Sequence, residues 1–449
     1  MGYFSFESRY LQRKEGSGRM AARGDPRVSR RVLVFLFAVL LVGPAAGAGF
    51  GIFEQGAKAI GLAGAFTARA DDPSASFHNA GGLAFFRDRS FQVGATFISA
   101  AGTDFIGAAP FPGPKVTESA EPLFKVPPHF YWVEPVGERW TFGLAVNSPF
   151  GLTSKWKSPT FSGRFVSVIG SLVSYDLNPN LAWKVSETLG IGFGPVLRFS
   201  EFELSRNQGF TNPLDAALID VARIDIRTNL ESGVGFQLGV LGRPRDGFSW
   251  GLAYKSEIET EFAGDSSLRQ NLTGFESIDD LVRTLLPLGQ SVPMTTELEY
   301  PAMASLGLAV AMRPNWLVEL DINWTGWSSL DELVLDFSGV LPASRDPLNW
   351  NDVYSYRLGV SRSTRREREW RFGFYFDETP QPLEDLGPLL ADGDRRGVSL
   401  GYGFETRSVG VDLALVYVPI EERLTQVNLD GFNGSYASTA TLFAVTVDW

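Results

Sequence analysis

Residues 370–377, Trp-Arg-Phe-Gly-Phe-Tyr-Phe-Asp, alternate four large aromatic side chains with Arg371, Gly373, Tyr375 and Asp377. Because successive side chains of a β-strand point to opposite faces, this period of two predicts a strand that separates two environments. Residues 316–324, Trp-Leu-Val-Glu-Leu-Asp-Ile-Asn-Trp, repeat the pattern, with the acidic and amide side chains all in one phase.

A further stretch, residues 223–236, divides in the same way. We expect one apolar face made of Ile224, Ile226, Leu230, Val234 and Phe236. The opposite, polar face then carries Arg223, Asp225, Arg227, Asn229 and Glu231.

Fourteen segments of this character follow residue 89. They are residues 90–101, 129–136, 140–148, 164–185, 188–204, 223–241, 247–262, 295–311, 315–327, 352–362, 369–378, 395–404, 408–418 and 438–449. Short connections alternate with connections of about a dozen residues or more. This rhythm and the even number of segments are typical of an up-and-down transmembrane barrel, whose apolar phase faces lipid and whose polar phase faces the lumen.

The tryptophans separate this interpretation from a soluble β-sandwich, which would show the same alternation. Each of a set of six lies within a few residues of a predicted short turn or of the C-terminus: Trp140, Trp183, Trp250, Trp316, Trp370 and Trp449. Membrane barrels carry aromatic girdles at their interfaces, whereas a sandwich has no reason to ring one edge with indoles. The sequence therefore predicts an all-β membrane protein, a 14-stranded antiparallel transmembrane β-barrel formed by residues 90–449.

Composition excludes several classes of function. Cysteine is absent and there are two histidines, so we expect no disulfide, no metal site and no cofactor. The net charge is -11, and residues 1–48 hold eight basic and three acidic side chains, which leaves about -16 for the remainder. Nucleic acid is not expected as a partner, because phosphate binding needs clustered Lys and Arg.

Residues 1–48 have the sections of a secretory signal peptide. Arg30 and Arg31 precede the apolar run Val32 to Val42, and Ala46-Gly47-Ala48 offers small residues for cleavage after Ala48. An apolar core of eleven residues is too short for a membrane anchor. Translation could begin at Met20 rather than at Met1.

Residues 49–86, between this leader and the first strand, are small, apolar and rich in glycine, so they can pack tightly in a confined space. We expect residues 49–89 to form a hatch inside the barrel. The run Asn79-Ala80-Gly81-Gly82-Leu83-Ala84, together with the Gly-Phe start, resembles the hatch of the FadL/TodX family of outer-membrane transporters. That hatch usually carries Asn-Pro-Ala followed by Gly-Leu, so Ala80 stands where proline is usual and Gly81 where alanine is usual.

Further segments resemble the same family in the right order: Ser148–Leu152, Gly163–Phe165, Asn178–Trp183, Trp324–Ser328, Phe376–Pro380 and Gly434–Tyr436. The run Thr441–Trp449 also resembles the terminal strand of bacterial outer-membrane proteins, which ends in an aromatic residue that the barrel assembly machinery reads. The resemblance implies a monomeric, multi-pass barrel in the bacterial outer membrane, among its lipid and lipopolysaccharide. Its implied function is uptake of long-chain fatty acids or related hydrophobic molecules past the hatch.

A carboxylate head group in the lumen would need a cation, and arginine binds carboxylates with two hydrogen bonds. Arg198, Arg227, Arg357 and Arg371 fall in the predicted lumenal phase. The alternative is that each pairs with a lumenal carboxylate. At the start of the hatch, Phe50, Ile52 and Phe53 either line a ligand pocket or only pack.

The third predicted strand ends at Val146-Asn147-Ser148-Pro149-Phe150-Gly151, where Pro149 cannot donate a ladder hydrogen bond. The family resemblance implies a kinked third strand that faces the hatch. We therefore expect a lateral opening there, with the turn of Asn79, Ala80, Gly81 and Gly82 against it. Gly143 lies in the lumenal phase of that strand.

Two long connections could present an apolar catching surface. Residues 275–292 place Ile278, Leu281, Val282 and Leu285 at helical spacing before Pro287, which predicts an amphipathic helix of about three turns. Residues 212–219, with Leu214 and Leu218, could form a second helix that starts at Pro213. The resemblance implies that these loops form an external groove, whereas the alternative is that the helices only cap the barrel.

Three other classes of function compete with uptake. An outer-membrane lipase needs a nucleophile beside a base, and neither His78 nor His129 lies beside a Ser-Asp arrangement. A general porin has no small-residue segment ahead of its first strand. A structural or adhesive barrel stays open, since sequence does not show transport.

Overall fold

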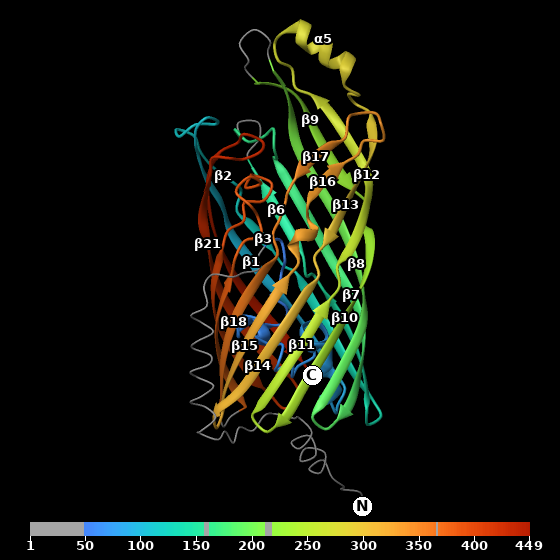
Figure 1. The fold of residues 1–449 in the computed structure, drawn as a ribbon, viewed down its shortest axis with the longest axis vertical. Helices are drawn as coiled ribbons and strands as arrows, with labels where there is room; N and C mark the ends of the chain where they lie inside the picture. The colour runs from blue at the N-terminus through green and yellow to red at the C-terminus, as the bar shows by residue number, and fades with distance from the viewer. Residues whose placement is uncertain (1–48, 157–160, 212–217, 365–366) are drawn as a thin grey trace, which may run out of the picture.

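The computed structural model describes residues 49–156, 161–211, 218–364 and 367–449, and the predicted leader therefore lies outside the described residues. Within these ranges the chain forms a closed antiparallel β-barrel of 14 spanning strands, as predicted (Figure 1). No helix among these residues is long and apolar enough to cross a membrane.

Several spanning strands are continuous: β1 (Ser90–Gly107), β7 (Ile169–Ser186), β8 (Leu189–Thr211), β15 (Trp316–Thr325), β18 (Val353–Ser363), β19 (Arg368–Asp377), β20 (Arg395–Glu405), β21 (Gly410–Thr425) and β22 (Gly434–Asp448). The others are interrupted and consist of two pieces each: β3 (Leu123–Lys125) with β4 (Pro128–Val136), β5 (Trp140–Asn147) with β6 (Gly151–Lys155), β9 (Leu218–Thr228) with β10 (Glu231–Arg245), β11 (Phe248–Lys255) with β12 (Ile258–Gln270), and β13 (Ser291–Tyr300) with β14 (Met303–Arg313). We number the spanning strands 1 to 14 in chain order, so β5 with β6 is strand 3.

Pairing of the last strand with the first closes the barrel. β22 pairs with β1 from Asp448↔Gln92 to Gly434↔Gly107, with a register shift between Ala100 and Thr103. A short β2 (Thr117–Ser119) pairs with the upper end of β1, at Asp104 to Ile106. Closure removes the two free edges of the sheet, which a membrane would not tolerate.

The period of two sorts the side chains as expected over most of the wall. In β19 the aromatic residues Trp370, Phe372 and Phe374 are exposed on the outside, whereas Arg371 and Tyr375 are buried inside. The tryptophans near the short turns also face outward, and Trp140 stacks on Trp183 with ring centroids 6.0 Å apart. This belt marks one membrane interface.

A second outward row runs through consecutive register partners of β11, β14, β15 and β18. Tyr254 pairs with Ala304, Ala304 with Trp324, and Trp324 with Tyr354. The row lies nearer the long loops than the first belt does, as the second aromatic girdle of a membrane barrel would.

The expected face assignment of residues 223–228 is wrong. Ile224 and Ile226 are buried inside the barrel, while the side chain of Arg227 is 78% exposed on the outside and pairs with Glu203. β8 pairs Glu203 with Arg227 and Ser200 with Glu231, so strand 6 has one more residue than its partner between these points. This β-bulge reverses the faces, and the period of two continued from β10 therefore fails above it.

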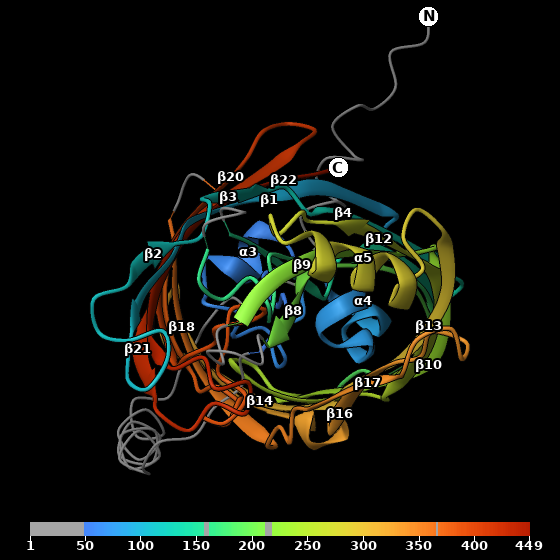
Figure 2. The same cartoon turned by 90° about the horizontal axis from the view of Figure 1, so that it is seen from above.

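Residues 49–86, which we call the N-terminal segment, lie within the ring of strands (Figure 2). Its short helices are α3 (Ala57–Ile60), α4 (Ala75–His78) and the 3₁₀-helix η1 (Ala80–Phe85). Most of its side chains are buried against the wall. Its small residues let it fit into a space bounded by strands on all sides, and the expectation that it moves as a hatch remains a prediction.

The long loops carry their own structure. The predicted amphipathic helix is present as α5 (Glu276–Leu285), above the ends of β9 and β12 (Figure 1). The second predicted helix is wrong at its end, because Leu218 and Ile219 already belong to β9, and residues 212–217, including Leu214, lie outside the described residues. A hairpin of β16 (Glu332–Leu335) and β17 (Ser344–Pro347) follows the 3₁₀-helix η2 (Trp327–Ser329).

Candidate functional site

Strand 3 is interrupted where the sequence predicted a lateral opening. β4 pairs with β5 as far as Phe130↔Val146. Beyond this point, and within the described ranges, β6 has a ladder only with β7, and β3 has one only with β1. The two walls meet again where the Glu121 N–H donates to the Lys155 carbonyl, 2.7 Å away. Strands 2 and 3 therefore separate along the stretch that follows Asn147.

The start of the N-terminal segment occupies this break. Gly51 forms a β-bridge with Phe150, the Ile52 N–H donates to the Pro149 carbonyl at 2.7 Å, and the Gly151 N–H donates to the Phe50 carbonyl at 3.0 Å. The Gln55 Nε2 donates to the Ser148 carbonyl at 2.9 Å. The backbone groups that Pro149 and its neighbours withdraw from the barrel ladder are thus satisfied by residues 50–55.

The expected position of the Asn79–Gly82 turn is wrong. The Asn79 Nδ2 donates to the Val240 carbonyl of β10 at 3.0 Å, and its Oδ1 accepts from the Gly81 N–H at 3.0 Å. Side chains on Gly190 or Gly192 of β8 would collide with this turn. The turn therefore lies against strands 5 and 6, because their glycines allow the backbone to approach closely. Residues 50–52, rather than this turn, face the break in strand 3.

Two carboxylates of β15 hold the middle of the segment. Asp321 Oδ2 accepts from the N–H groups of Phe66 and Thr67, each at 2.9 Å. Glu319 Oε1 accepts from those of Ala68 and Arg69, at 2.8 Å and 3.0 Å. Both side chains are buried, so these bonds replace the hydrogen bonds that water would make to the four N–H groups.

The first residue of the segment is fixed from the loop that joins β19 to β20. The Gly49 N–H donates to Asp392 Oδ2 at 2.9 Å. Arg395 Nη2 donates to the Gly49 carbonyl at 2.6 Å and to Asp392 Oδ1 at 2.8 Å. A Cβ on Gly49 would lie 2.7 Å from Trp327, and its φ is +67°, so glycine is required here.

Phe50 enters an aromatic cluster near the centre of the barrel, together with Phe150, Tyr300, Trp327 and Trp350. Its ring centroid lies 4.6 Å from that of Trp327 and 5.9 Å from that of Phe150. The cluster therefore connects the N-terminal segment with the break in strand 3. Ile52 and Phe53 are partly buried, and Phe53 lines a cavity beside the segment.

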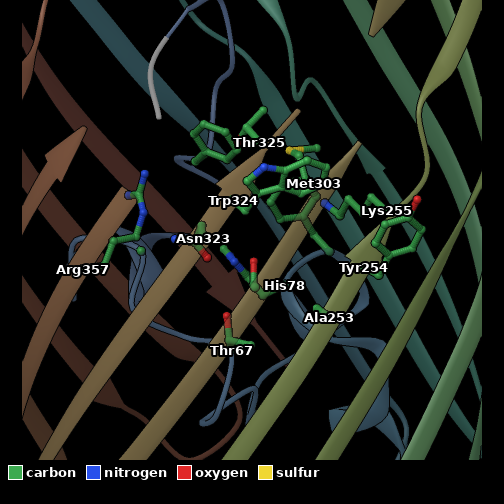
Figure 3. A pocket seen from close by; sticks show the side chains of 14 residues that line it. Thr67, His78, Ala253, Tyr254, Lys255, Met303, Asn323, Trp324, Thr325 and Arg357 are labelled. Carbon is green, nitrogen blue, oxygen red and sulfur yellow. The ribbon is translucent and has the colours of Figure 1, made fainter. Parts of the chain in front are cut away.

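A small cavity beside the segment, partly open to solvent, has about 60 Å³ of room for the centres of water molecules. Its lining includes Phe53, Phe77, His78, Lys255, Met303 and Arg357. Arg357 lies at one side and Tyr254 at the other, with His78 and Asn323 between them (Figure 3). Burial lowers the pKa of His78 to about 3, so the ring is neutral and its Nε2 donates to the Gln55 carbonyl at 2.8 Å.

Sequence reasoning missed Lys255. Its Nζ lies 3.2 Å from the centroid of the Phe77 ring, and none of the described residues forms a salt bridge with it. The signal was available, because Trp250, Leu252 and Tyr254 fall in the lipid phase of the predicted strand and Lys255 in the lumenal phase.

The arginine candidates that do lie in the lumen are already paired. Arg198 makes two bonds of 2.8 Å with Asp176 and lies over the rings of Phe150 and Tyr300. Arg357 pairs with Asp377 at 3.1 Å and donates to the Ala63 carbonyl. Arg371 pairs with Asp412 and Glu369. These contacts agree with the alternative interpretation, in which each lumenal arginine pairs with a lumenal carboxylate.

The loop-groove candidates lie partly on the surface. Leu281 and Leu285 of α5 are 42% and 65% exposed, Leu218 of β9 is 47% exposed, and Ile278 is partly buried. These side chains offer apolar area outside the barrel, and their role as a groove remains a prediction.

The chain matches the family model described as outer membrane protein transport protein (OMPP1/FadL/TodX) over residues 38–449. It is 24% identical over 393 residues to a long-chain fatty acid transport protein of Escherichia coli O6:H1, covering 83% of this chain and 86% of the relative. It is also 24% identical over 419 residues to outer membrane protein P1 of Haemophilus influenzae, covering 85% and 88%.

Two solved structures share the fold. The FadL homologue of Pseudomonas aeruginosa superposes with a TM-score of 0.77 at 22% identity, covering 90% of this chain and 99% of that one. The toluene transporter TodX of Pseudomonas putida gives 0.65 at 16% identity, covering 91% and 99%. The family match over nearly the whole barrel agrees with the closed wall, the aromatic belts and the inserted N-terminal segment, and this chain belongs to the OMPP1/FadL/TodX family of outer-membrane transport proteins.

Proposed function

We propose that this protein takes up hydrophobic molecules across the outer membrane and releases them sideways through the break in strand 3, with the N-terminal segment as a movable hatch. The observation that carries the proposal is the seating of residues 50–52 in that break. Names of relatives support it, since they include long-chain fatty acid and toluene transporters.

Sideways release follows from the chemistry of the cargo. Burying hydrocarbon is worth about 0.8 kcal/mol per CH₂, so a long acyl chain that leaves into lipid avoids a large cost of crossing water. The break offers such an exit once residues 50–52 withdraw. The backbone groups that these residues now satisfy would then need water or ligand, which favours return of the hatch.

A cysteine pair tests the gate. A Cβ on Gly151 would lie 3.0 Å from Ile52 Cδ1, so Ile52→Cys with Gly151→Cys brings two thiols together in a chain without other cysteines. We expect uptake of oleate by cells to stop on oxidation and to return on reduction. The matched control, Phe404→Cys with Val411→Cys, joins register partners of β20 and β21. Normal uptake by the oxidised Ile52–Gly151 variant would contradict the gate.

The cavity suggests long-chain fatty acids as the cargo class. The amino group of Lys255 lies over the Phe77 ring at the cavity, whereas Arg198, Arg357 and Arg371 are held by carboxylates. We infer that Lys255 receives the carboxylate head and that the acyl chain lies along Phe77, Phe53 and Met303. A hydrogen bond to a charged group is worth about 1.5–3 kcal/mol, or roughly a 10- to 100-fold change in affinity.

Lys255→Met tests this assignment. Oleate binding to the purified protein should weaken by about 10- to 100-fold, while binding of oleyl alcohol, which has no charge, should change little. Lys155→Met is the control, because Lys155 pairs with Glu121 near the surface. An equal loss for oleate and oleyl alcohol would indicate lost packing and would refute the head-group role.

We propose that the chain works as a monomer, that its outer wall contacts lipid and lipopolysaccharide, and that the barrel assembly machinery reads the end of β22. A catalytic role has no support from the histidines, since His78 bonds to Gln55 and His129 Nε2 lies 3.0 Å from Thr446 Oγ1.

A further inference from the structure

Strands 6 and 7 run side by side without a β-ladder in the upper half of the barrel, on a different side from the break in strand 3. β10 pairs with β11 up to Gln237↔Lys255, and β9 pairs with β12 from Thr228↔Gly264. Among these described strands, no ladder joins residues 230–235 to residues 257–262. The register is the same on both sides of this stretch, which we call the seam.

The period of two explains why the seam has no ladder. The bulge of strand 6 lies at Asn229 and Leu230, at the upper end of the seam, whereas strand 7 changes face at Ser256 and Glu257, at the lower end. Between these points Val234 points outward and is 67% exposed, while Ile258, which would oppose it, is buried inside. Opposed residues of a ladder must share a face, so the two strands are out of phase over the seam.

The neighbouring interface shows the contrast. Strand 8 changes face at Pro301 and Ala302, directly opposite the change in strand 7, and the ladders continue on both sides from Lys255↔Met303 to Ile258↔Tyr300. At these two interfaces of the described residues, the ladder is therefore missing only where the two strands change face at different heights, as strands 6 and 7 do.

Within the seam the strands touch without a ladder, and backbone hydrogen bonds join them at its two ends, from the Ser256 N–H to the Phe236 carbonyl and from the Asn229 N–H to the Ala263 carbonyl, each at 2.9 Å. A Cβ on Gly233 would lie 2.5 Å from the Glu259 carbonyl oxygen and 2.6 Å from Ile258 Cγ2, and one on Gly235 would lie 2.6 Å from Ile258 Cγ1. Ile258 itself belongs to the aromatic cluster with Phe50, Phe150 and Tyr300. Because no ladder has to break when the strands move apart here, the seam is a weak point of the wall that leads to the cluster.

The surroundings of the seam indicate what could cross it. It begins directly above Tyr254, in the outward aromatic row, and Ala253, Tyr254 and Lys255 below it line the cavity. Its strand 6 side exposes apolar Leu230 and Val234 to the outer membrane surface.

The other side of the seam is acidic. Glu257, Glu259 and Glu261 point outward on strand 7, and on strand 8 Glu299 and Glu297 stand directly opposite Glu259 and Glu261. Like charges repel lipid phosphates and carboxylates from this side, so anionic head groups are disfavoured there and uncharged apolar molecules are not.

We propose that the seam between strands 6 and 7 is a second lateral passage, through which uncharged hydrocarbons enter the cavity and the aromatic cluster from the head-group level of the outer membrane face, just above the aromatic row of Tyr254. The inference rests on the proposed uptake function and adds a route and a class of cargo to it. Movement of Ile258 and of the Glu259 backbone away from Gly233 and Gly235 opens the passage.

A cross-link across the seam tests the proposal. Val234→Cys with Glu259→Cys places outward thiols on the two sides, for closure with a short bifunctional thiol reagent, and the chain has no other cysteine. The control pair, Val240→Cys with Leu252→Cys, joins register partners in the intact ladder below. Uptake of radiolabelled toluene and of oleate is measured in cells before and after the reagent.

We expect the seam cross-link to reduce toluene uptake at least tenfold and to leave oleate uptake unchanged, with no effect of the control cross-link. Unchanged toluene uptake overturns the passage, and equal loss of both cargoes overturns the selection against charge. No uptake of either cargo by the unmodified protein would instead refute the proposed function. Independently, amide hydrogen exchange at residues 231–235 and 257–262 should be faster than at residues 237–242, and equal protection would refute the missing ladder.

Discussion

Asp321→Ala should release the middle of the N-terminal segment while leaving the barrel folded. Asp321 Oδ2 accepts from the N–H groups of Phe66 and Thr67, both at 2.9 Å, and the carboxylate is fully buried. Alanine leaves these two N–H donors without a partner in the protein. An unsatisfied buried donor costs about 1–3 kcal/mol, so the pair costs about 2–6 kcal/mol in the docked state.

The size of this effect makes it measurable. Each 1.4 kcal/mol is a factor of about ten, so the equilibrium constant for undocking of the segment should rise by roughly 30-fold to more than 10⁴-fold. The wall loses little, because β15 keeps its ladders with β14 and β18 on both sides of Asp321. Asp321→Asn keeps an oxygen acceptor and should show a smaller rise.

Amide hydrogen exchange followed by mass spectrometry measures the opening directly, at peptides that cover residues 60–75. The exchange rate there should rise strongly in Asp321→Ala and less in Asp321→Asn. It should not change in Glu203→Ala, because the Glu203 side chain pairs with Arg227 on the outer surface. Unboiled electrophoretic migration reports the folded barrel. Unchanged protection of residues 66–69 in a folded Asp321→Ala barrel would refute the reasoning that this carboxylate holds the segment.

Further outcomes test other contacts. Protein purified from outer membranes should begin at Gly49. The backbone nitrogen of Gly49, 2.9 Å from Asp392 Oδ2, would then be the N-terminal ammonium. Mass spectrometry that finds residues 1–31 retained would exclude the leader. Deleting Gly49–Phe53 should keep the barrel folded, as its unboiled migration would show, and should impair uptake of hydrophobic cargo; unchanged uptake would count against a role of these residues in passage. Gly143→Trp should displace the segment, because even a Cβ there would lie 2.6 Å from Leu83 Cδ1, and normal oleate uptake with the indole confirmed in place would contradict it. Arg198→Met should lower the free energy of unfolding of the barrel by about 3–5 kcal/mol in denaturant titrations, since it leaves Asp176 buried and unpaired. Arg227→Met, on the surface, should cost less, and a larger loss for Arg227→Met than for Arg198→Met would refute the expectation that the buried pair matters more.

The sequence predicted the wall well where strands are continuous. In β19 buried and exposed side chains alternate along the strand, so each residue number gives the face directly, and in β15 Glu319 and Asp321 are buried as their phase predicted. The same reasoning was wrong for Ile224, Ile226 and Arg227, because one extra residue at Asn229 and Leu230 reverses the faces above it. A bulge is defined by the partner strand, so the pattern within one strand does not reveal it.

The candidate site shows the same division. Pro149 marked the break in strand 3, since a residue without an N–H cannot complete a ladder, but it did not show that Phe50, Gly51 and Ile52 would occupy the break. The lumenal arginines were identified by their phase, whereas their carboxylate partners come from other strands. Lys255 has no such partner among the described residues, and this depends on which side chains the fold places next to it.

By itself, then, the sequence determined the properties that depend on local order: an all-β chain, alternating faces, a belt of indoles near the short turns and a helix over residues 276–285. Local order decides these because strand and helix periods act between near neighbours in the chain. Only the tertiary structure decided which part of the N-terminal segment faces strand 3, which lumenal cation has no carboxylate partner among the described residues, and where strands 6 and 7 run out of phase. Each of these depends on groups brought together from distant parts of the chain, as Gly49 and Asp392 are, and the distance between them is set by closure of the whole barrel.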